Sequence, residues 1–391
     1  MDSHERLNLL SQQMDFEPAE DVHCPKVSKP GKEPIISQAV LPNGKRISLL
    51  KTLLTSACER NCYYCPFRAG RNFKRATFKP DELAITFMDL HRAGIAQGIF
   101  LSSGIIGGGI RTQDLLIDSA AILRKKMSYS GYLHLKIMPG AEFDQVRRAM
   151  QLADRVSINL EAPNTQRLSL LAPGKQYLDE LLEPLRWIEQ IRKENTPHQN
   201  WRARWPSSTT QFVVGAAGET DLELLSTTQK LYQQYGLGRA YFSTFKPVPD
   251  TPLESLPPES PLRQNRLYQA SFLLRDYQFD IEELPLDSSG NLPLHTDPKM
   301  GWALSNLSDR PVEINQADLG QLLRIPGIGP KGARTILSLR RKGRIGSLRE
   351  LARLGIQTSR AAPFILIGGK RPGYQISLFG ENPALYETGF S

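Results

Sequence analysis

Three of the four cysteines in the chain lie close together, in the segment TSACERNCYYCPF (55–67). Cys58, Cys62 and Cys65 form a C-x3-C-x2-C pattern, while Cys24 lies far upstream. Three thiolates can hold an iron–sulfur cluster with one iron left open, whereas structural zinc usually takes four protein ligands. The pattern therefore favours a cluster. The alternative is a zinc site completed by Cys24 or His23.

Composition limits the classes of protein that could carry this pattern. The chain has 391 residues, of which 40% are hydrophobic and 23% charged, which is typical of a globular protein with two or three domains. The N-terminus is polar, and no segment approaches the roughly 18 apolar residues of a membrane span. We therefore expect a cytoplasmic protein with no membrane partner. In that reducing compartment clustered cysteines bind metals or do redox chemistry rather than form disulfides.

The cysteine spacing, with Tyr64 before the last cysteine and Pro66 after it, resembles the cluster loop of the radical S-adenosylmethionine (radical SAM) superfamily. The resemblance implies that Cys58, Cys62 and Cys65 hold a 4Fe-4S cluster and that S-adenosylmethionine chelates its fourth iron. It also implies a 5′-deoxyadenosyl radical as the reactive species, and a reductant such as flavodoxin or ferredoxin. The cofactors would supply the chemistry, and the protein would position the substrate.

The pattern around the cysteines predicts alternating strands and helices. Strand-like runs lie at 47–54, 97–103, 131–137, 154–161, 209–215 and 239–247, and helical patterns at 80–94, 112–126, 142–153, 175–194, 219–236 and 261–277. This alternation predicts a parallel α/β fold, and the resemblance implies a partial (β/α)6 radical SAM barrel. The cysteine loop follows the first strand, at the edge where α/β sites lie.

Strand alternation predicts which side chains face the lumen of the barrel. Val156, Ile158 and Leu160 would pack outward, which leaves Ser157, Asn159 and Glu161 inward. By the same reasoning His134 and Lys136 point inward. Buried polar groups need partners, which a bound cofactor would supply. A water-filled lumen, or a strand packed the other way round, are the alternatives.

The other motifs of the superfamily are matched unevenly. The second strand ends in Ser102, Ser103 and Gly104 where the family usually has Gly-Gly-Glu. QFVVGAAGETD (211–221) resembles the segment that approaches adenine, with Gly215 as its first glycine. The residues that the resemblance assigns to S-adenosylmethionine are Tyr64, Ser102, Ser103, Gly104, Lys136, Ser157, Asn159, Glu161 and Gly215. GIIGGG (104–109) lacks the Lys-Ser/Thr of a P-loop, so we expect a mobile loop there.

The second half of the chain contains PGIGPKGA (326–333), which resembles a helix-hairpin-helix motif. A weaker second copy begins at SLRELARLGI (347–356) and keeps only Gly355. Tight turns at glycine would present backbone N–H groups and a helix N-terminus to a phosphate. The predicted DNA-binding residues are Gly327, Ile328, Gly329, Lys331, Gly332 and Arg334.

The charge of this region points to the same partner. Residues 309–373 hold 13 Lys and Arg against 4 Asp and Glu, a net charge of +9 that equals the charge of the whole chain. Such a basic module gains affinity by displacing counterions from nucleic-acid phosphates without reading sequence. The alternative for 340–344 (RRKGR) is an ordinary solvated helix end.

The two halves together resemble one radical SAM family, whose members carry a helix-hairpin-helix region after the barrel. These proteins have been called DNA modification or repair proteins, with a uracil-DNA-glycosylase-like protein as their genomic companion. We predict an N-terminal extension (1–44), a partial barrel (45–283), a linker (284–308), a small all-α tandem helix-hairpin-helix domain (309–370) and a flexible tail (371–391).

The tail contains QISLF (375–379), which resembles the peptide that docks bacterial DNA-repair and replication proteins on the sliding clamp. Gln375, Leu378 and Phe379 would make that contact, since two adjacent apolar side chains fill a pocket while an amide hydrogen-bonds beside it. The alternative is that Leu378 and Phe379 fold back onto the barrel.

Three functions are consistent with the sequence. The first is a radical SAM enzyme that modifies or repairs a flipped, damaged or single-stranded nucleotide of DNA. The second keeps the chemistry and replaces DNA with tRNA or another RNA. The third is a non-catalytic DNA-binding protein with a structural cluster.

Overall fold

The computed structural model describes residues 1–17, 36–40 and 44–373. It divides into two compact units. The first comprises Met1–Glu219 with Lys230–Glu259, and the second Thr220–Gln229 with Ser260–Ser391. Within the described residues no helix combines the length and the apolar character needed to cross a membrane.

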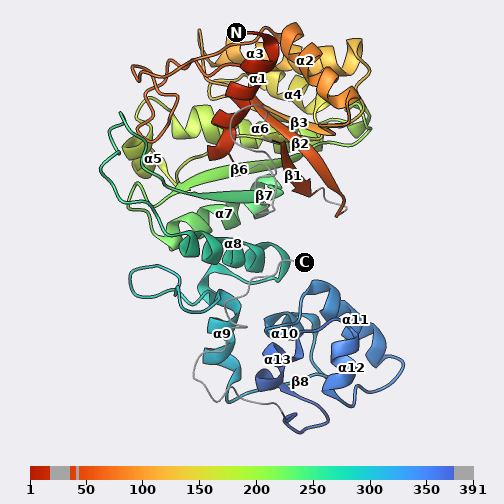
Figure 1. The fold of residues 1–391 in the computed structure, drawn as a ribbon. Helices are drawn as coiled ribbons and strands as arrows, with labels where there is room; N and C mark the ends of the chain where they lie inside the picture. The colour runs from red at the N-terminus through yellow and green to blue at the C-terminus, as the bar shows by residue number, and fades with distance from the viewer. Residues whose placement is uncertain (18–35, 41–43, 374–391) are drawn as a thin grey trace. The chain divides into compact units, whose positions relative to one another are not determined.

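The first unit is built on a curled, half-barrel sheet of seven strands that follow one another in chain order (Figure 1). The strands are β1 (Ile36–Val40), β2 (Arg46–Leu53), β3 (Gly98–Ser102), β4 (Tyr132–Lys136), β5 (Arg155–Ser157), β6 (Ser207–Val214) and β7 (Arg239–Thr244). β2 to β7 are parallel, and β1 pairs antiparallel with β2. The predicted parallel α/β fold is confirmed.

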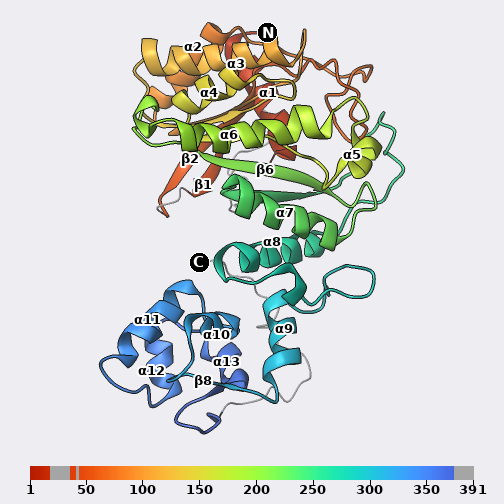
Figure 2. The same cartoon turned by 180° about the vertical axis from the view of Figure 1, so that it is seen from behind.

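Helices alternate with these strands, as the sequence predicted. They are α2 (Pro80–Arg92), α3 (Gly109–Ala121), α4 (Phe143–Leu152), α5 (Thr165–Leu171), α6 (Glu183–Glu194) and α7 (Asp221–Tyr235). π-helical turns extend α3 at Ile122–Lys126 and precede α6 at Tyr177–Leu182. α2, α3, α4 and α6 pack side by side on the outer face of the sheet (Figures 1 and 2). The inner face is therefore left for the lumen.

Two elements differ from the sequence prediction. The region expected to be an N-terminal extension contributes α1 (Ser3–Gln12), the 3-10 turn Gln13–Phe16 and β1, which joins the sheet. The predicted strand 154–161 is regular only over Arg155–Ser157, because the chain then leaves the ladder and returns to β6 through a single bridge at Glu161. The alternation of side chains nevertheless continues to residue 161.

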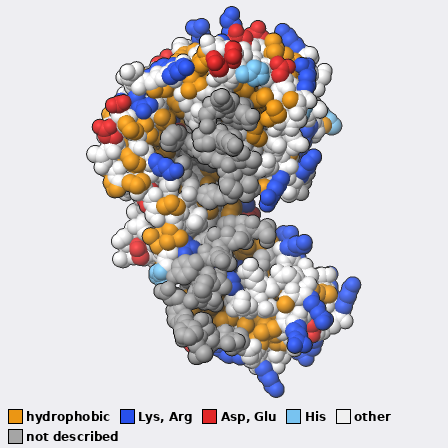
Figure 3. Space-filling model, in the orientation of Figure 1, with side chains coloured by type: hydrophobic (Ala, Val, Ile, Leu, Met, Phe, Trp, Pro, Cys, Tyr) orange, Lys and Arg blue, Asp and Glu red, His pale blue; other side chains and the backbone are white. Residues whose placement is uncertain are grey.

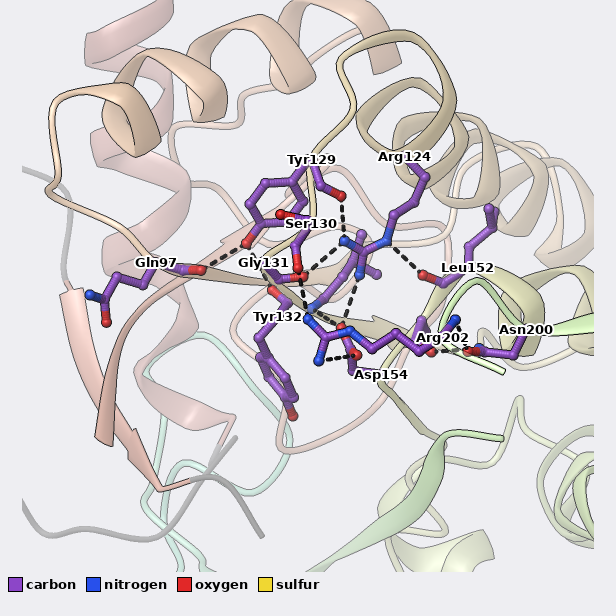
Figure 4. Close-up of polar contacts among 12 residues, drawn as sticks. Gln97, Arg124, Tyr129, Ser130, Gly131, Tyr132, Leu152, Asp154, Asn200 and Arg202 are labelled. Atoms are coloured by element: carbon purple, nitrogen blue, oxygen red, sulfur yellow. Dashed lines mark hydrogen bonds and ion pairs between the residues drawn. The ribbon is translucent and has the colours of Figure 1, made fainter. Parts of the chain in front are cut away.

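A buried ion pair joins α3's π turn to the start of β5 (Figure 4). The Arg124 guanidinium donates to the Asp154 carboxylate at 2.9 Å, to Tyr129 O at 2.7 Å and to Leu152 O at 3.0 Å. Its Cζ lies 3.5 Å from the centroid of the Trp201 ring. The two charged side chains are 4% and 3% exposed. Burial lowers the pKa of Arg124 to about 10 and raises the pKa of Asp154, so each charge depends on the other.

We expect Arg124→Met to lower the free energy of unfolding by about 3 kcal/mol or more, because it leaves a buried carboxylate with its main partner removed. The control is Arg147→Ala, which breaks the Arg147–Asp144 pair of 2.9 Å between side chains that are 43% and 75% exposed. That change should cost about 1 kcal/mol or less. Urea denaturation followed by circular dichroism measures both; equal losses would show that the buried pair contributes nothing special.

The second unit is helical. It contains α8 (Pro261–Asp276), α9 (Pro298–Leu307), α10 (Leu319–Arg324), α11 (Pro330–Arg340), α12 (Leu348–Arg353) and α13 (Thr358–Ala361), and the short parallel pair β8 (Val312–Glu313) and β9 (Ile365–Leu366). The stretch expected to be a linker therefore includes a helix. Met300, Ala303 and Leu307 of α9 pack into the same apolar core as α10 and α11, which explains why it is ordered.

Candidate functional site

The cysteine loop begins where β2 ends, at the carboxyl edge of the parallel strands. Leu54 N donates to Ser102 O at 2.8 Å, so the loop leaves the sheet beside the end of β3. Glu59 N donates to Ile105 O at 2.8 Å, and Tyr63 N donates to Leu171 O at 2.7 Å. The loop is thus fixed by backbone hydrogen bonds to the segment after β3 and to the end of α5.

The three thiols are free, and two of them accept hydrogen bonds from neighbouring backbone amides. The Cys58 Sγ accepts from Ile105 N at 3.5 Å, and the Cys65 Sγ accepts from Phe67 N at 3.4 Å. Burial raises the pKa of Cys62 and of Cys65, so metal loading, which requires thiolates, would release protons. Among the described residues no three His, Cys, Asp or Glu side chains converge on a single ion position. The thiolates of a cluster need not converge on one point, because each binds a different iron.

Arg75 holds the cysteine loop together, although no pattern in the sequence indicated this role. Its guanidinium donates to Ser56 O and Phe67 O at 3.4 Å each, to Arg68 O at 3.3 Å and to Arg71 O at 2.8 Å. Its Cζ also lies 4.2 Å from the centroid of the Phe73 ring. One cation therefore satisfies carbonyls on both sides of the three cysteines.

The loop 104–109, expected to be mobile, is tied to the cysteine loop. The Glu59 carboxylate accepts from Gly107 N at 2.9 Å and from Gly108 N at 3.1 Å. Both glycines have positive φ, +67° and +91°, which turns their amides toward this carboxylate. These two hydrogen bonds fix one conformation of the loop, and its mobility stays a prediction. Glu59 lies between the first two cysteines, and no spacing rule would have identified its partner.

Gly104, predicted to contact S-adenosylmethionine, lies against the backbone of the cysteine loop. Its N–H donates to Thr55 O at 2.7 Å. A Cβ at this position would lie 2.1 Å from Ala57 O and 3.2 Å from the Cys58 Cβ. Only glycine allows the end of β3 to approach the first cysteine so closely.

We therefore expect Gly104→Ala to displace the loop at Cys58 and to reduce the iron content of reconstituted protein by about half or more, with the fold retained. The control is Gly343→Ala, because no atom of the described chain lies within 4 Å of a Cβ placed there. Iron analysis together with circular dichroism gives the comparison. Full iron content in the Gly104 variant would contradict the close-approach argument.

Polar side chains line the inner face of the half-barrel and pair mostly with one another. His134 Nε2 lies 2.8 Å from Ser157 Oγ, and Lys136 Nζ donates to Asn159 Oδ1 at 2.6 Å. Val156, Ile158 and Leu160, on the opposite face, are fully buried. The predicted inward and outward faces are confirmed. The expectation that a cofactor must satisfy the polar face needs correction, since these residues supply most of the partners themselves.

Two buried polar atoms on this face lack a hydrogen-bond partner in the described part of the chain: Glu161 Oε2 and His134 Nδ1. Glu161 has φ of +65°, and its other oxygen accepts from Lys175 Nζ at 3.0 Å. Burial lowers the pKa of His134 well below its usual range, with Arg155 and Lys136 adding to the effect, so the ring is neutral. The unpaired Glu161 oxygen fits a ligand that carries N–H, ammonium or hydroxyl donors.

Lys175 is a site residue that sequence reasoning missed. Burial alone would lower the pKa of Lys175, but the charges of Glu161 and of the Cys62 and Cys65 thiolates outweigh it, and the pKa is raised. Burial and the same carboxylate raise the pKa of Tyr64. An ammonium thus lies close to the cysteine loop, where it compensates negative charge. The surrounding sequence, LAPGKQY, has no periodicity that could have indicated this.

The remaining predicted cofactor residues lie at strand ends. Ser102 ends β3, and the Ser103 hydroxyl donates to Gly104 O at 2.7 Å. Gly215 follows β6 with φ of +97°, and its N–H donates to the Glu219 carboxylate. Its position thus requires glycine for backbone reasons that involve no cofactor. Cys24 and His23 lie outside the described residues, so the zinc alternative through them remains untested.

The second unit carries the predicted DNA-binding turn between α10 and α11. Gly327 has φ of +83°, and a Cβ there would lie 2.4 Å from Gln357 O. Gln357 N donates to Gly327 O at 3.2 Å, so the turn 354–357 of the second predicted hairpin packs against the first. Gly355 repeats the positive φ, at +78°. Ile328 and Ile356 are buried at matching positions of the two turns.

Gly329 differs from expectation. Its φ is −94°, so it is not a left-handed turn residue but the N-cap of α11. No side chain of the described residues caps the first amides of α11. A Cβ placed at Gly332 would lie 3.4 Å from the Ile356 side chain. Lys331 and Arg334 are exposed on the first turns of the helix.

Lys and Arg side chains project from the surface of this unit (Figure 3). The exposed ones are Lys331, Arg334, Arg341, Lys342, Arg344, Arg349 and Arg353. Within the described residues none of these seven has a carboxylate at ion-pair distance, in contrast to Arg324, which pairs with Glu283 at 2.7 Å. Their charge is therefore available to an anionic partner.

The first unit is thus an α/β half-barrel of parallel strands with a triad of thiols at its carboxyl edge. Residues 52–231 match the family model described as the Radical SAM superfamily. This part of the chain is thus similar to radical SAM domains, and enzymes with such domains use a 4Fe-4S cluster and S-adenosylmethionine as cofactors. Enzymes of this superfamily need a reductant such as flavodoxin or ferredoxin. A comparison with curated proteins finds no similar sequence.

Several solved structures are similar to part of this chain. The FeFe-hydrogenase maturase HydG from Carboxydothermus hydrogenoformans is 15% identical with a TM-score of 0.44, and the alignment covers 58% of this chain and 51% of that one. Methylornithine synthase (PylB) is 16% identical with a TM-score of 0.46, covering 59% and 63%. Coproporphyrinogen III oxidase (HemN) from Escherichia coli is 13% identical with a TM-score of 0.35, covering 57% and 51%. The chain thus spans half to under two thirds of the length of these structures.

Proposed function

We propose that the protein is a radical SAM enzyme that modifies or repairs DNA. The observation that carries the proposal is the combination, in one chain, of a thiol triad at the carboxyl edge of a domain similar to radical SAM domains and a separate unit that carries a glycine turn and seven exposed Lys and Arg side chains. The first feature supports radical chemistry. The second supports a polyanionic substrate.

Cys58, Cys62 and Cys65 would hold the cluster, since they are the clustered thiols of the chain and lie on a loop fixed by Arg75 and Glu59. When bound, the cluster and S-adenosylmethionine supply a 5′-deoxyadenosyl radical that abstracts hydrogen from the substrate. The Ser102–Gly104 segment lies beside this loop, and Tyr64 is part of it. The unpaired oxygen of Glu161 suits the ammonium of the methionine moiety, and Ser157 and Asn159 offer polar groups to the rest of the cofactor.

The unit with α10 to α13 would bind DNA as a tandem helix-hairpin-helix domain. The paired turns at Gly327 and Gly355, each with a buried isoleucine after the glycine, support a twofold repeat. The uncapped start of α11 offers amides to a phosphate, and Lys331 and Arg334 add charge beside it. These contacts are to the backbone, so the module would deliver many sequences to the barrel.

Nucleoside analysis tests this function. The reconstituted protein is incubated anaerobically with S-adenosylmethionine and dithionite, with duplex DNA, single-stranded DNA or tRNA, and the digested nucleic acid is examined by mass spectrometry. We expect 5′-deoxyadenosine together with a new or repaired deoxynucleoside. A modified ribonucleoside from the tRNA sample alone would favour the RNA alternative. Absence of 5′-deoxyadenosine in every sample would favour a structural cluster.

Further partners are part of the same proposal. A uracil-DNA-glycosylase-like companion is implied only by the resemblance, and a cytoplasmic location only by composition. Gln375, Leu378 and Phe379 lie outside the described residues, so docking on the sliding clamp stays a prediction, to be tested with a 371–391 peptide and its Leu378→Ala, Phe379→Ala variant.

A further inference from the structure

The inner face of the half-barrel holds a carboxylate that belongs to the N-terminal segment. Both oxygens of Glu17 lie 3.1 Å from Lys136 Nζ, although 119 residues separate the two in sequence. The Lys136 side chain is 7% exposed and that of Glu17 is 22% exposed. Lys136 Nζ also donates to Asn159 Oδ1. This ammonium is therefore shared between Asn159, which follows β5, and Glu17, which belongs to the segment before β1.

A second lysine holds the same segment. Lys51 Nζ donates to Glu17 O at 2.7 Å and to Met14 O at 3.1 Å. Lys51 pairs in register with Phe100, which pairs with His134, so these three lie in one row on one face of the sheet. Lys136 follows two residues after His134 on that face, and its Nζ lies 6.0 Å from the centroid of the Phe100 ring. Glu17 therefore lies between the amines of β2 and β4, over the Phe100 side of β3.

The chemistry of this position defines what could replace Glu17. The Lys136 side chain is only 7% exposed, so its charge would be strongly destabilised by desolvation if the Glu17 carboxylate moved away and no other anion replaced it. A replacement must therefore carry negative charge. Glu17 uses its carboxylate on Lys136 and only its backbone carbonyl on Lys51, whereas a phosphate has enough oxygens to accept from both amines in charge-assisted bonds.

We propose that Lys51 and Lys136 form an anion site in the lumen that takes a phosphate of the target nucleotide, and that Glu17 occupies this site as an internal competitor until substrate enters. The identity of the anion rests on the proposed function. The site would hold the target strand by its backbone beside the polar row of Ser157 and Asn159, where the cofactor is expected. S-adenosylmethionine carries the other candidate anion, its carboxylate, so the test includes both ligands.

The test compares variants whose effects should have opposite signs. The protein is reconstituted and unreduced, and carries Lys331→Ala and Arg334→Ala so that the hairpin does not dominate binding. Affinity for 5′-phosphorylated trithymidylate is measured by titration calorimetry under anaerobic conditions. We expect Glu17→Gln to bind about tenfold more tightly, and Lys136→Met and Lys51→Met about tenfold more weakly, which is the effect of adding or removing one charge-assisted hydrogen bond. Lys136→Met should also abolish the higher affinity of Glu17→Gln in the double variant.

Two outcomes would overturn the proposal. The first is an unchanged or weaker affinity for the trinucleotide in Glu17→Gln, which a merely structural ion pair would give. The second is tighter binding of S-adenosylmethionine alone, which would assign the site to the cofactor's carboxylate. Because neither measurement needs turnover, failure here is distinct from failure of the proposed function, which the nucleoside analysis reports separately.

Discussion

Reconstituted Cys62→Ala protein should contain less than about one iron per chain, where the parent protein should contain about four, and should release no 5′-deoxyadenosine on reduction with dithionite. The proposed cluster has three protein ligands, so the loss of one would leave two irons open and the cluster labile. Cys62 is the least exposed of the three thiols, at 6%, and solvent or a neighbouring side chain cannot easily replace it. Cys58→Ala and Cys65→Ala should behave alike.

Cys24→Ala is the matched control, since it removes the one thiol outside the triad. It should leave iron content and 5′-deoxyadenosine release unchanged, because a free cysteine is more often inert than functional. Loss of iron in Cys24→Ala, or retention of stoichiometric zinc with no nucleoside release in the parent protein, would instead support a site with four protein ligands.

The parallel sheet could be predicted because its strands are short apolar runs separated by amphipathic helices. β3, for example, is buried at every position, and α2 begins at Pro80 as its sequence indicated. β1 could not be found in this way, because its residues are only partly buried and it pairs antiparallel at the edge of the sheet. Hydrophobic patterns in the sequence identify strands that are buried on both faces of a sheet, but they give little information about a strand at its edge.

The site was predictable where its residues are adjacent in sequence and obscure where the fold brings distant residues together. The three cysteines follow from spacing alone. The Glu161–Lys175 pair and the contact of Glu17 with Lys136 depend on chain paths that no periodicity encodes. Gly104 illustrates an intermediate case, because its position beside the site was predicted, but the reason that it is glycine lies in its distance to Ala57 O.

The hairpin unit shows the same limit in its glycines. Gly327 and Gly329 were both expected to make the tight turn, yet only Gly327 adopts positive φ. Gly329 instead leaves the start of α11 without a side-chain cap among the described residues. The sequence identifies the motif, but which of its glycines adopts positive φ depends on the backbone path. Because the start of α11 is uncapped, Lys331 and Arg334 lie beside backbone amides that have no side-chain partner.

Lys331→Ala, Arg334→Ala protein should bind DNA about tenfold or more weakly at moderate salt, for all sequences alike. Each lysine or arginine that neutralises a phosphate contributes about 0.9 to the slope of log K against log salt, so the slope should fall in magnitude by about 2. Fluorescence anisotropy of a labelled duplex over a range of salt concentrations measures both quantities. Release of 5′-deoxyadenosine without DNA should persist, because neither residue belongs to the radical SAM domain.

Lys125→Ala, Lys126→Ala provides the control for this experiment. It removes the same two positive charges from an exposed π turn of the barrel unit. If net charge alone governed affinity, both double variants would lose the same amount of affinity for DNA, and the hairpin would have no special role. If the hairpin variant kept its salt slope, phosphates would have to bind elsewhere on the chain. A change in slope confined to Lys331 and Arg334 is expected, because these two cations stand beside amides that can bind the same phosphate, and charge without such donors binds weakly.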